Sequence, residues 1–358
     1  MTGTPDVELG LIEGYYGTPW PWDARRETMA FLAPHGYGFF LYAPKADPFL
    51  RRRWREDFPK ETRDGLRGMA EHCARLDVRF GVGLSPFEIY RAFDAEAREA
   101  LARKLADLAA VGIQDLAVLF DDMRGDLPDL AERQIAILHW IAERTNASRV
   151  ILCPTYYSDD PVLDRVFGPR PEHYLEDLGT GLDPGIEIFW TGEEVCSREY
   201  GAGHLGRVAD QLRRKPVLWD NYPVNDGPVM SQALHLRAFT GRPASVAGRI
   251  AAHAVNPALQ PVLTRIPALT LADSYRRAEG YEYGAAFARA AAAVLGADLA
   301  EIVRGHLAWL QDTGLDRLGE RAARLRARYA SFAHPAAREI VAWLDGAWRV
   351  TAQTMEGS

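Results

Sequence analysis

Short apolar runs, rich in β-branched and aromatic residues, recur along the first two-thirds of the chain. Runs of this length and composition are typical of buried β-strands. We expect strands at residues 9–16, 37–42, 78–84, 116–120, 150–153, 186–190, 217–219 and 249–255. The last of these runs has the weakest pattern.

The stretches between the runs have helical periodicity. Residues 94–110 place Leu101, Leu105 and Leu108 on one helical face, and residues 127–144 repeat the pattern. Strands that alternate with helices in this rhythm predict a (β/α)₈ TIM barrel, which we assign to residues 1–276. An open, doubly wound sheet is the structural alternative, but the GxGxxG motif expected after its first strand is missing.

The pattern changes after residue 276. Residues 284–295, 299–311 and 320–348 are rich in Ala, Leu and Arg with helical spacing. We therefore expect residues 277–358 to form a C-terminal α-helical domain. Because no Gly/Ser-rich linker precedes it, we expect it to pack against the barrel.

Composition narrows the functional classes. The net charge of −7 does not suggest a nucleic-acid-binding surface, and the basic run at residues 51–55 is interpreted as a solvated loop. The three cysteines are far apart, which argues against a disulfide framework or a zinc site, and Cys153 is expected to be a buried, inert thiol. The polar first residues do not resemble a signal peptide, and no apolar run is long enough to span a membrane. A cytoplasmic protein without metal or cofactor is expected, and the pattern leaves its oligomeric state open.

The residues that follow the apolar runs carry the candidate chemistry, because a TIM barrel builds its active site at the carboxyl ends of its strands. These positions are dense in aromatic rings, carboxylates and amides, with one lysine. Aromatic rings suit the flat apolar faces of sugars, and planar polar groups suit their hydroxyl rims. Neither a Gly-rich phosphate loop nor a cluster of metal ligands is present among them. The pattern therefore favours a sugar-binding barrel.

Two adjacent acids, Asp121 and Asp122, follow the fourth run. If the backbone turns there, both carboxyl groups can face the cavity, and mutual repulsion should raise one of their pKa values. The alternative is that one of them only caps the next helix. The usual glycosidase carboxylates lie on separate strands. Adjacent acids instead suit substrate-assisted hydrolysis, in which the acetamido group of the sugar attacks its own anomeric carbon.

Several segments resemble the family 84 glycoside hydrolases, the group of O-GlcNAcases and bacterial β-N-acetylglucosaminidases. They are GLIEGYYGTPW at 10–20, LYAPK at 41–45, WR at 54–55, FDD at 120–122, CPT at 153–155, WTG at 190–192, WDN at 219–221 and ND at 225–226. They follow in the family's order over roughly residues 8–260. The resemblance implies a retaining β-N-acetylglucosaminidase that uses no metal and passes through an oxazoline intermediate.

The resemblance also implies roles for single residues around the acetamido group. Asp121 would orient that group and stabilise the oxazolinium, and Asp122 would act as general acid and then as general base. Tyr157 would position the acetyl carbonyl, Trp219 would line the acetyl pocket, and Asn221 would bind near the acetamido group and the leaving oxygen.

Four further residues would hold the rest of the sugar. Gly14 would offer a backbone contact, Lys45 and Asp226 would bind hydroxyl groups, and Asn256 would lie near the same rim. The sequence departs from the family pattern at Ala46, where an acid is common, and at Tyr156, where a glutamate is usual. The second departure leaves open whether Tyr156 or Tyr157 reaches the substrate.

Two other functions remain open at this stage. The chain could be a catalytically inactive sugar-binding barrel, or it could hydrolyse another 2-acetamido glycan such as hyaluronan. The expected partner is a glycan or glycoprotein that contains N-acetylglucosamine. The aglycone could be a glycoprotein, a peptidoglycan fragment or a glycosaminoglycan.

Overall fold

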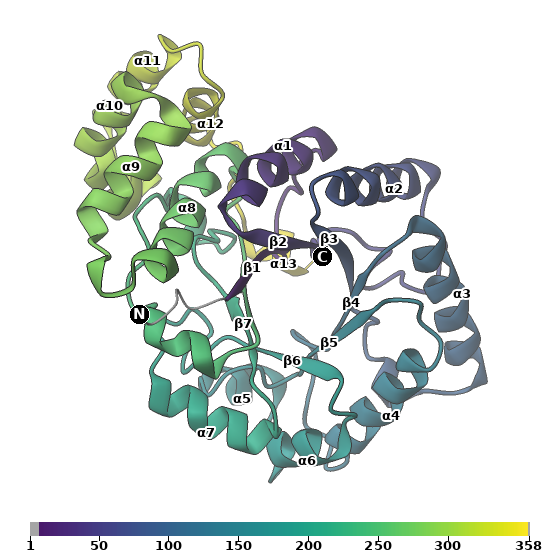
Figure 1. Cartoon of the computed structure of the whole chain (residues 1–358). Coiled ribbons are helices and arrows are strands. Elements are labelled where there is room, and N and C mark those ends of the chain that lie inside the picture. The colour runs from purple at the N-terminus through teal and green to yellow at the C-terminus, as the bar shows by residue number, and fades with distance from the viewer. Residues whose placement is uncertain (1–6, 357–358) are drawn as a thin grey trace.

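Eight parallel strands close into a barrel in which each strand pairs with its neighbours in sequence and β8 pairs with β1 (Figure 1). The computed structural model describes residues 7–356. The strands are β1 Glu8–Glu13, β2 Tyr37–Tyr42, β3 Arg79–Leu84, β4 Asp115–Leu119, β5 Arg149–Cys153, β6 Ile186–Trp190, β7 Val217–Asp220 and β8 Ala252–Val255. This closed order confirms the TIM barrel and excludes the doubly wound sheet. The first strand ends at Glu13, three residues earlier than its apolar run predicts.

The strands read as continuous apolar runs because side chains on both faces are buried, one set inside the barrel and the other under the helices. All five residues of β4 are buried, for example. The inside is tightly filled. A Cβ atom added at Gly81 of β3 would lie 2.5 Å from the carbonyl oxygen of Asp115, so only glycine allows this approach of β3 to β4.

Helices surround the barrel. They are α1 Trp22–Leu32, α2 Lys60–Arg75, α3 Ala95–Val111, α4 Leu130–Ala142, α5 Val162–Phe167, α6 Tyr174–Gly181, α7 Ala202–Leu212 and α8 Pro261–Arg277. The predicted helices at 94–110 and 127–144 are confirmed as α3 and α4. Local chemistry sets the bounds of α3, since the side chain of Asp94 accepts a hydrogen bond from Ala97 N at 2.9 Å and Gly112 ends the helix with φ of 87°.

Five α-helices follow α8 in the described part of the chain, and all of them except α13 lie together beside α8 and α1 (Figure 1). They are α9 Tyr283–Leu295, α10 Ala297–Leu307, α11 Glu320–Ala330, α12 Pro335–Leu344 and the short α13 Ala352–Glu356. A π-helical turn at Ala308–Thr313 continues α10. The stretch at 320–348, which has helical spacing throughout, forms two separate helices, α11 and α12. His334 is extended, with φ of −121° and ψ of 138°, as the residue before a proline prefers, and Pro335 begins the new helix.

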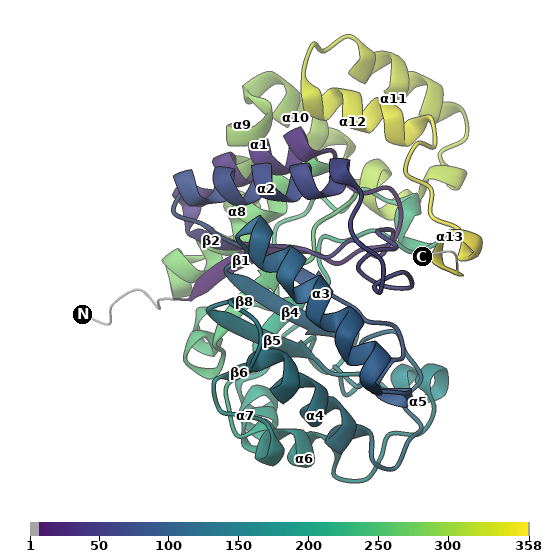
Figure 2. The same cartoon turned by 90° about the vertical axis from the view of Figure 1, so that its right-hand side faces the viewer.

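These C-terminal helices are tied to the barrel by buried polar contacts. The carboxylate of Glu339 on α12 accepts hydrogen bonds from Val262 N and Leu263 N, both at 2.9 Å, and so caps α8. Trp343 Nε1 donates to the carbonyl oxygen of Ser231 in the loop after β7, at 3.1 Å. The division of the chain at residue 277 stays a prediction. After α12 the chain runs to the end of the barrel at which the strands finish, where α13 lies (Figure 2).

Three further observations concern residues 7–356. No helix there is long and apolar enough to cross a membrane. No group of three or more His, Cys, Asp or Glu side chains in that range has the arrangement of a metal site. The basic run at 51–55 is not the solvated loop that was predicted, because Arg51 and Trp54 are buried and only the other three arginines are exposed.

Candidate active site

The carboxyl ends of the strands surround a cavity of about 240 Å³. This volume is slightly below the range of pockets for drug-sized ligands and suits a single sugar ring. The cavity is lined by every site residue that the sequence predicts: Gly14, Lys45, Asp121, Asp122, Tyr157, Trp219, Asn221, Asp226 and Asn256. Residues far apart in the sequence converge here because parallel strands all end at the same mouth of the barrel.

The two acids after β4 both face this cavity, and the backbone explains how. Asp122 has φ of 58°, in the left-handed region that non-glycine residues rarely adopt. This turn breaks the alternation of an extended strand, which would send neighbouring side chains to opposite faces. The helix-capping alternative is therefore wrong for both residues. The cap position of α4 is Asp129, and neither acid takes its place.

Lys45 holds the pair from the end of β2. Its ammonium group is hydrogen-bonded to Asp121 Oδ2 and lies 3.4 Å from Asp122 Oδ2. The other oxygen of Asp121, Oδ1, is buried and accepts no hydrogen bond from any residue in the described part of the chain. An unpaired buried carboxylate oxygen is costly, and Asp121 lines a ligand-sized cavity, so this oxygen is where we expect a ligand to place a donor.

The charges around Asp122 favour its ionised form. Burial opposes ionisation, but the nearby Lys45 ammonium and Arg51 guanidinium outweigh it, and the pKa of Asp122 lies below its ordinary value. The Tyr16 hydroxyl adds to this effect by donating to Asp122 Oδ2 at 2.8 Å. The prediction that repulsion raises one pKa of the pair is thus wrong for Asp122.

Tyr157 and Tyr156 occupy different places. Tyr157 lines the cavity, and its hydroxyl lies 3.4 Å from Asp122 Oδ1. Tyr156 points away into the protein, where its hydroxyl donates to the carbonyl oxygen of Gly168 at 2.7 Å and its ring packs edge-on against Tyr174. The open choice between the two tyrosines therefore falls on Tyr157.

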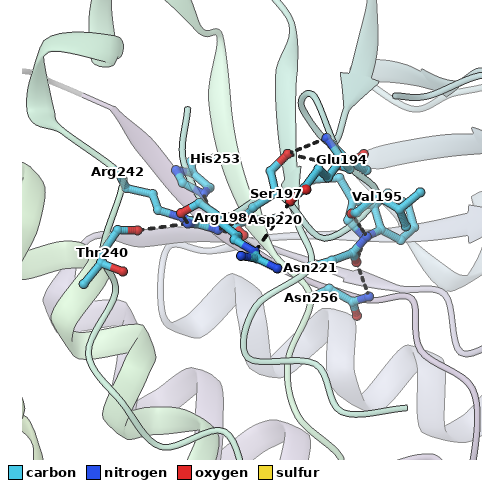
Figure 3. Close-up of polar contacts among 12 residues, drawn as sticks. Glu194, Val195, Ser197, Arg198, Asp220, Asn221, Thr240, Arg242, His253 and Asn256 are labelled. Carbon is cyan, nitrogen blue, oxygen red and sulfur yellow. Dashed lines mark hydrogen bonds and ion pairs between the residues drawn. The ribbon is translucent and has the colours of Figure 1, made fainter. Parts of the chain in front are cut away.

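The opposite wall of the cavity is built from amides. Asn221 Oδ1 accepts hydrogen bonds from Trp219 Nε1 at 3.0 Å and from Asn256 Nδ2 at 2.9 Å (Figure 3). Asn221 Nδ2 donates to the carbonyl oxygen of Val195 at 2.8 Å. Gly14 closes the ring, since its N–H lies 3.2 Å from Asn256 Oδ1. A Cβ atom at Gly14 would lie 2.2 Å from Trp219 Cζ2, so a side chain there would displace the indole.

A buried ionic network lies behind this wall (Figure 3). Asp220, at the end of β7, is fully buried and receives Arg242 Nη2 at 2.6 Å and His253 Nε2 at 2.9 Å. Arg242 also donates to the carbonyl oxygens of Ser197 at 2.7 Å and Thr240 at 2.9 Å. The network therefore fastens the loop after β6, which carries Val195, to the strand that carries the amide wall. His253 is fully buried, and both of its ring nitrogens have partners, Asp220 and the Tyr275 hydroxyl.

Asp226 lies on the loop after β7 and is partly exposed to the cavity. Its Oδ2 accepts a hydrogen bond from Tyr16 N at 2.8 Å. Burial, together with the negative charge of Asp122, raises the pKa of Asp226 to about 6 against the effect of that N–H. Asp226 thus changes charge near the neutral range.

Comparison with known proteins identifies the family. A family model described as beta-N-acetylglucosaminidase matches residues 9–306. The chain belongs to this family. The resemblance to family 84 glycoside hydrolases, and with it the assignment to the glycoside hydrolases, is confirmed.

Two curated relatives of this β-N-acetylglucosaminidase family member are the mouse and rat proteins named Protein O-GlcNAcase. Each is 29% identical over 276 residues, which is 75% of this chain and 30% of the relative. The chain thus spans less than a third of the length of these relatives. A solved structure of a variant O-GlcNAc hydrolase from Thermobaculum terrenum matches with a TM-score of 0.78 and 27% identity, over 94% of this chain and 80% of that one.

Sequence reasoning missed some of the residues that line the cavity of this family member. They are Tyr16, Cys153, Thr191, Val195, Cys196, Val224, Gly227, Met230 and Met355. Tyr16 and Thr191 stand inside segments already recognised, so strand-end position could have found them. Met355 on α13 gave no signal, because nothing in its local sequence says that the C-terminal segment returns to the barrel mouth. Cys153 is buried, and burial raises the pKa of its thiol well above the ordinary value, as an inert thiol requires.

Proposed function

We propose that the chain is a retaining β-N-acetylglucosaminidase of the O-GlcNAcase type that works by substrate-assisted catalysis. The unpaired, buried Oδ1 of Asp121 carries this proposal, because Asp121 lines a cavity of sugar size together with a second carboxyl group. An amide N–H of a 2-acetamido sugar is a donor of the kind this oxygen lacks.

The reaction would take two steps. In the first, the acetamido carbonyl oxygen attacks the anomeric carbon while the bond to the leaving oxygen breaks and Asp122 gives that oxygen its proton. Asp121 accepts the acetamido N–H and stabilises the positive charge of the resulting oxazolinium. In the second, Asp122 takes a proton from water as the water oxygen attacks the anomeric carbon and the ring opens to the acetamide. Two inversions at that carbon retain the β configuration.

Asp122 must carry a proton before the leaving group departs, although Lys45 and Arg51 lower its pKa. A bound sugar would exclude water from the cavity, which raises the cost of a negative charge on Asp122 beside a second carboxyl group. Lys45, whose closer partner is Asp121, compensates that carboxylate first. Binding thus favours a proton on Asp122.

Different residues of the cavity walls would bind the acetyl group and the hydroxyl groups of the sugar. Tyr157, Trp219 and Asn221 line the cavity, and we assign them to the acetyl group of the sugar. Lys45 and Asp226 offer a donor and an acceptor for hydroxyl groups, with Asn256 beside them. The natural partner is a glycan or glycoprotein that bears terminal β-linked N-acetylglucosamine, in keeping with the names of the relatives.

The test compares leaving groups. Wild-type protein should release the aglycone from aryl β-N-acetylglucosaminides. Asp122→Asn should lose about 10²–10⁴-fold in kcat/KM when the leaving group is a poor one such as methanol, and much less when it is dinitrophenolate, which departs without a proton. Asp210→Asn, at an exposed position on α7, is the matched control and should leave kcat/KM unchanged on both substrates.

Each other outcome has a distinct meaning. Equal losses on both leaving groups would contradict the acid role of Asp122. Binding of N-acetylglucosamine without hydrolysis of any substrate would show an inactive sugar-binding barrel. Preference for galacto-configured substrates or for hyaluronan fragments would place the activity on another 2-acetamido glycan.

A further inference from the structure

Arg51 stands beside the presumed acid without lining the cavity. Its side chain is almost fully buried, at 4% exposed, and its Nη2 donates to the backbone carbonyl oxygen of Asp122 at 3.0 Å. Its guanidinium carbon lies 5.3 Å from the centre of the Phe87 ring, a cation–π distance. It is unusual for a buried arginine side chain to hydrogen-bond only one backbone carbonyl, because burying a charge is costly unless ion pairs or hydrogen bonds compensate for the lost hydration.

The carbonyl that Arg51 holds belongs to a strained residue. Asp122 has φ of 58°, and the left-handed region is unfavourable for a residue with a Cβ atom. Such conformations persist only when the surrounding structure enforces them. The same turn brings the Asp122 carboxyl into the cavity next to that of Asp121, so whatever holds the turn also holds the catalytic geometry.

Arg51 is itself firmly placed. The turn that carries it begins at Asp47, whose Oδ1 accepts a hydrogen bond from Phe49 N at 2.9 Å. Arg51 N lies 3.2 Å from the carbonyl oxygen of Pro48, and Leu50 O accepts Ser85 N at 2.8 Å, which ties this turn to the end of β3. The loops after β2 and β3 therefore hold Arg51 in place, and Arg51 in turn hydrogen-bonds the backbone of Asp122 just after β4.

Other charged and titratable groups also face the Asp122 carboxyl. Tyr16 comes from the loop after β1, Lys45 from the end of β2, Tyr157 from the loop after β5 and Asp226 from the loop after β7, while Asp121 is its neighbour in sequence. All of them line the cavity and so can contact a sugar. Arg51 differs because it reaches Asp122 from the protein side, where a bound sugar does not interrupt the contact.

We propose that Arg51 is a positioning residue that fixes the left-handed turn at Asp122 and thereby aims its carboxyl group at the leaving oxygen. This inference rests on the proposed function, in which Asp122 is the acid. Arg51 does not touch the substrate. Its positive charge also favours the ionised form of Asp122, together with Lys45.

The experiment uses Arg51→Met, which removes the charge and the hydrogen bond, and Arg51→Lys, which keeps the charge but loses the planar fork. Arg55→Met is the matched control, since Arg55 is an exposed arginine of the same segment that stacks on Trp54. For each variant, kcat and KM are measured against pH with a methyl and a dinitrophenyl β-N-acetylglucosaminide. Folding is checked by circular dichroism.

Arg51→Met should lower kcat on the methyl glycoside about 10–100-fold, a part of the acid contribution, with a smaller loss on the dinitrophenyl glycoside and little change in KM. The pH limb that Asp122→Asn abolishes should move to higher pH, because a positive charge beside the acid is gone. Arg51→Lys should restore that limb but not the full kcat. Arg55→Met should match wild type.

Losses of equal size on both glycosides, with the pH limb unmoved, would overturn the inference and leave Arg51 a stabilising residue. Should Arg51→Met fail to fold, Arg51→Lys decides. A crystal structure of it that keeps Asp122 left-handed, with wild-type kcat on the methyl glycoside, would also overturn the inference. If Asp122→Asn itself shows no dependence on the leaving group, the proposed function has failed, and not only the role of Arg51.

Discussion

The two ends of this barrel each carry a cluster of charged side chains, yet the clusters differ in what they leave unpaired. At the amino ends of the strands, fully buried Asp115 receives Arg79 at 3.0 Å and lies 3.5 Å from Arg149. Glu8 and Glu187 pair with the same two arginines, at 2.7 Å and 2.5 Å. Both oxygens of Asp115 face cations, and each acid of this cluster has an arginine partner, while the one buried side-chain nitrogen that lacks a hydrogen bond there, among residues 7–356, is Arg149 Nη1.

At the carboxyl ends of the strands the balance is different. Asp121, Asp122 and Asp226 share a cavity with a single ammonium group, that of Lys45. Asp121 Oδ1 has no partner within residues 7–356, and the pKa of Asp226 is raised to about 6. The acids at the amino ends of the strands are thus each paired with an arginine, whereas three acids at the carboxyl ends share one ammonium group. We infer that the first stabilises the fold and that the second binds and converts a ligand.

Of the changes that test this comparison, the largest effect is expected at Asp121. Replacing it with Asn should lower kcat about 10²–10³-fold, the size expected when one preorganised charge at the reacting centre is removed. The assay is steady-state hydrolysis of an aryl β-N-acetylglucosaminide by protein that circular dichroism shows to be folded. A fall of less than about threefold would remove Asp121 from the reaction.

The opposite end should respond in stability. Asp115→Asn leaves Arg79 and Arg149 without their shared buried partner and should lower the free energy of unfolding by about 1–3 kcal/mol. Urea unfolding measures this, and kcat of the folded protein at 25 °C should stay within twofold of wild type. Glu187→Gln, at a carboxyl group 32% exposed, is the milder control and should cost less than about 1 kcal/mol. A large loss of kcat in Asp115→Asn would erase the distinction between the two ends.

The raised pKa of Asp226 should make substrate binding at the barrel mouth depend on pH. Because this carboxyl group gains its proton as pH falls through about 6, it loses acceptor capacity for sugar hydroxyls below that pH. The value of kcat/KM should therefore fall about tenfold between pH 7 and pH 5, since this ratio reports the free enzyme. Asp226→Asn should have a lower kcat/KM than wild type at pH 7, and its kcat/KM should not show this fall between pH 7 and pH 5. If the variant keeps the limb, another group is titrating.

The smallest effect concerns the C-terminal segment. Met355 on α13 and Met230 both line the cavity, beyond the strand ends, where an aglycone would leave. Met355→Ala should raise KM about twofold to threefold for a phenyl glycoside, through lost apolar contact, and leave KM for the methyl glycoside unchanged. Gln353→Ala, exposed on the same helix, is the control. Equal changes for both glycosides would place Met355 away from the aglycone.

Much of the barrel and its mouth could be predicted because the physics involved is local or periodic. Apolar runs mark strands that are buried on both faces, and parallel strands bring their carboxyl ends together whatever their distance in sequence. Residues as distant as Gly14 and Asn256 could therefore be assigned to one cavity, and the structure places them 3.2 Å apart. The break before Pro335 had a local signal too, which helical periodicity alone overlooked.

The rest depends on distances that a sequence does not contain. An arginine run looks the same whether solvated or buried, so Arg51 gave no sign of its contact with Asp122. Adjacent acids predict that repulsion raises a pKa. In the structure the positive charges of Lys45 and Arg51 lie near Asp122 and lower its pKa, and the sequence does not show that these charges lie there. Met355 reaches the cavity only through the course of the C-terminal segment, which depends on contacts such as that of Val350 N with Ser231 Oγ at 3.2 Å.

The most direct test of the central claim is a crystal structure with the thiazoline derived from N-acetylglucosamine, a stable mimic of the oxazoline. The account predicts that the thiazoline nitrogen lies about 2.7–3.1 Å from Asp121 Oδ1, with Asp122 beside the anomeric carbon on the face from which the leaving group departs. A thiazoline bound in the cavity with Asp121 Oδ1 still unpaired, or bound elsewhere on the protein, would contradict it.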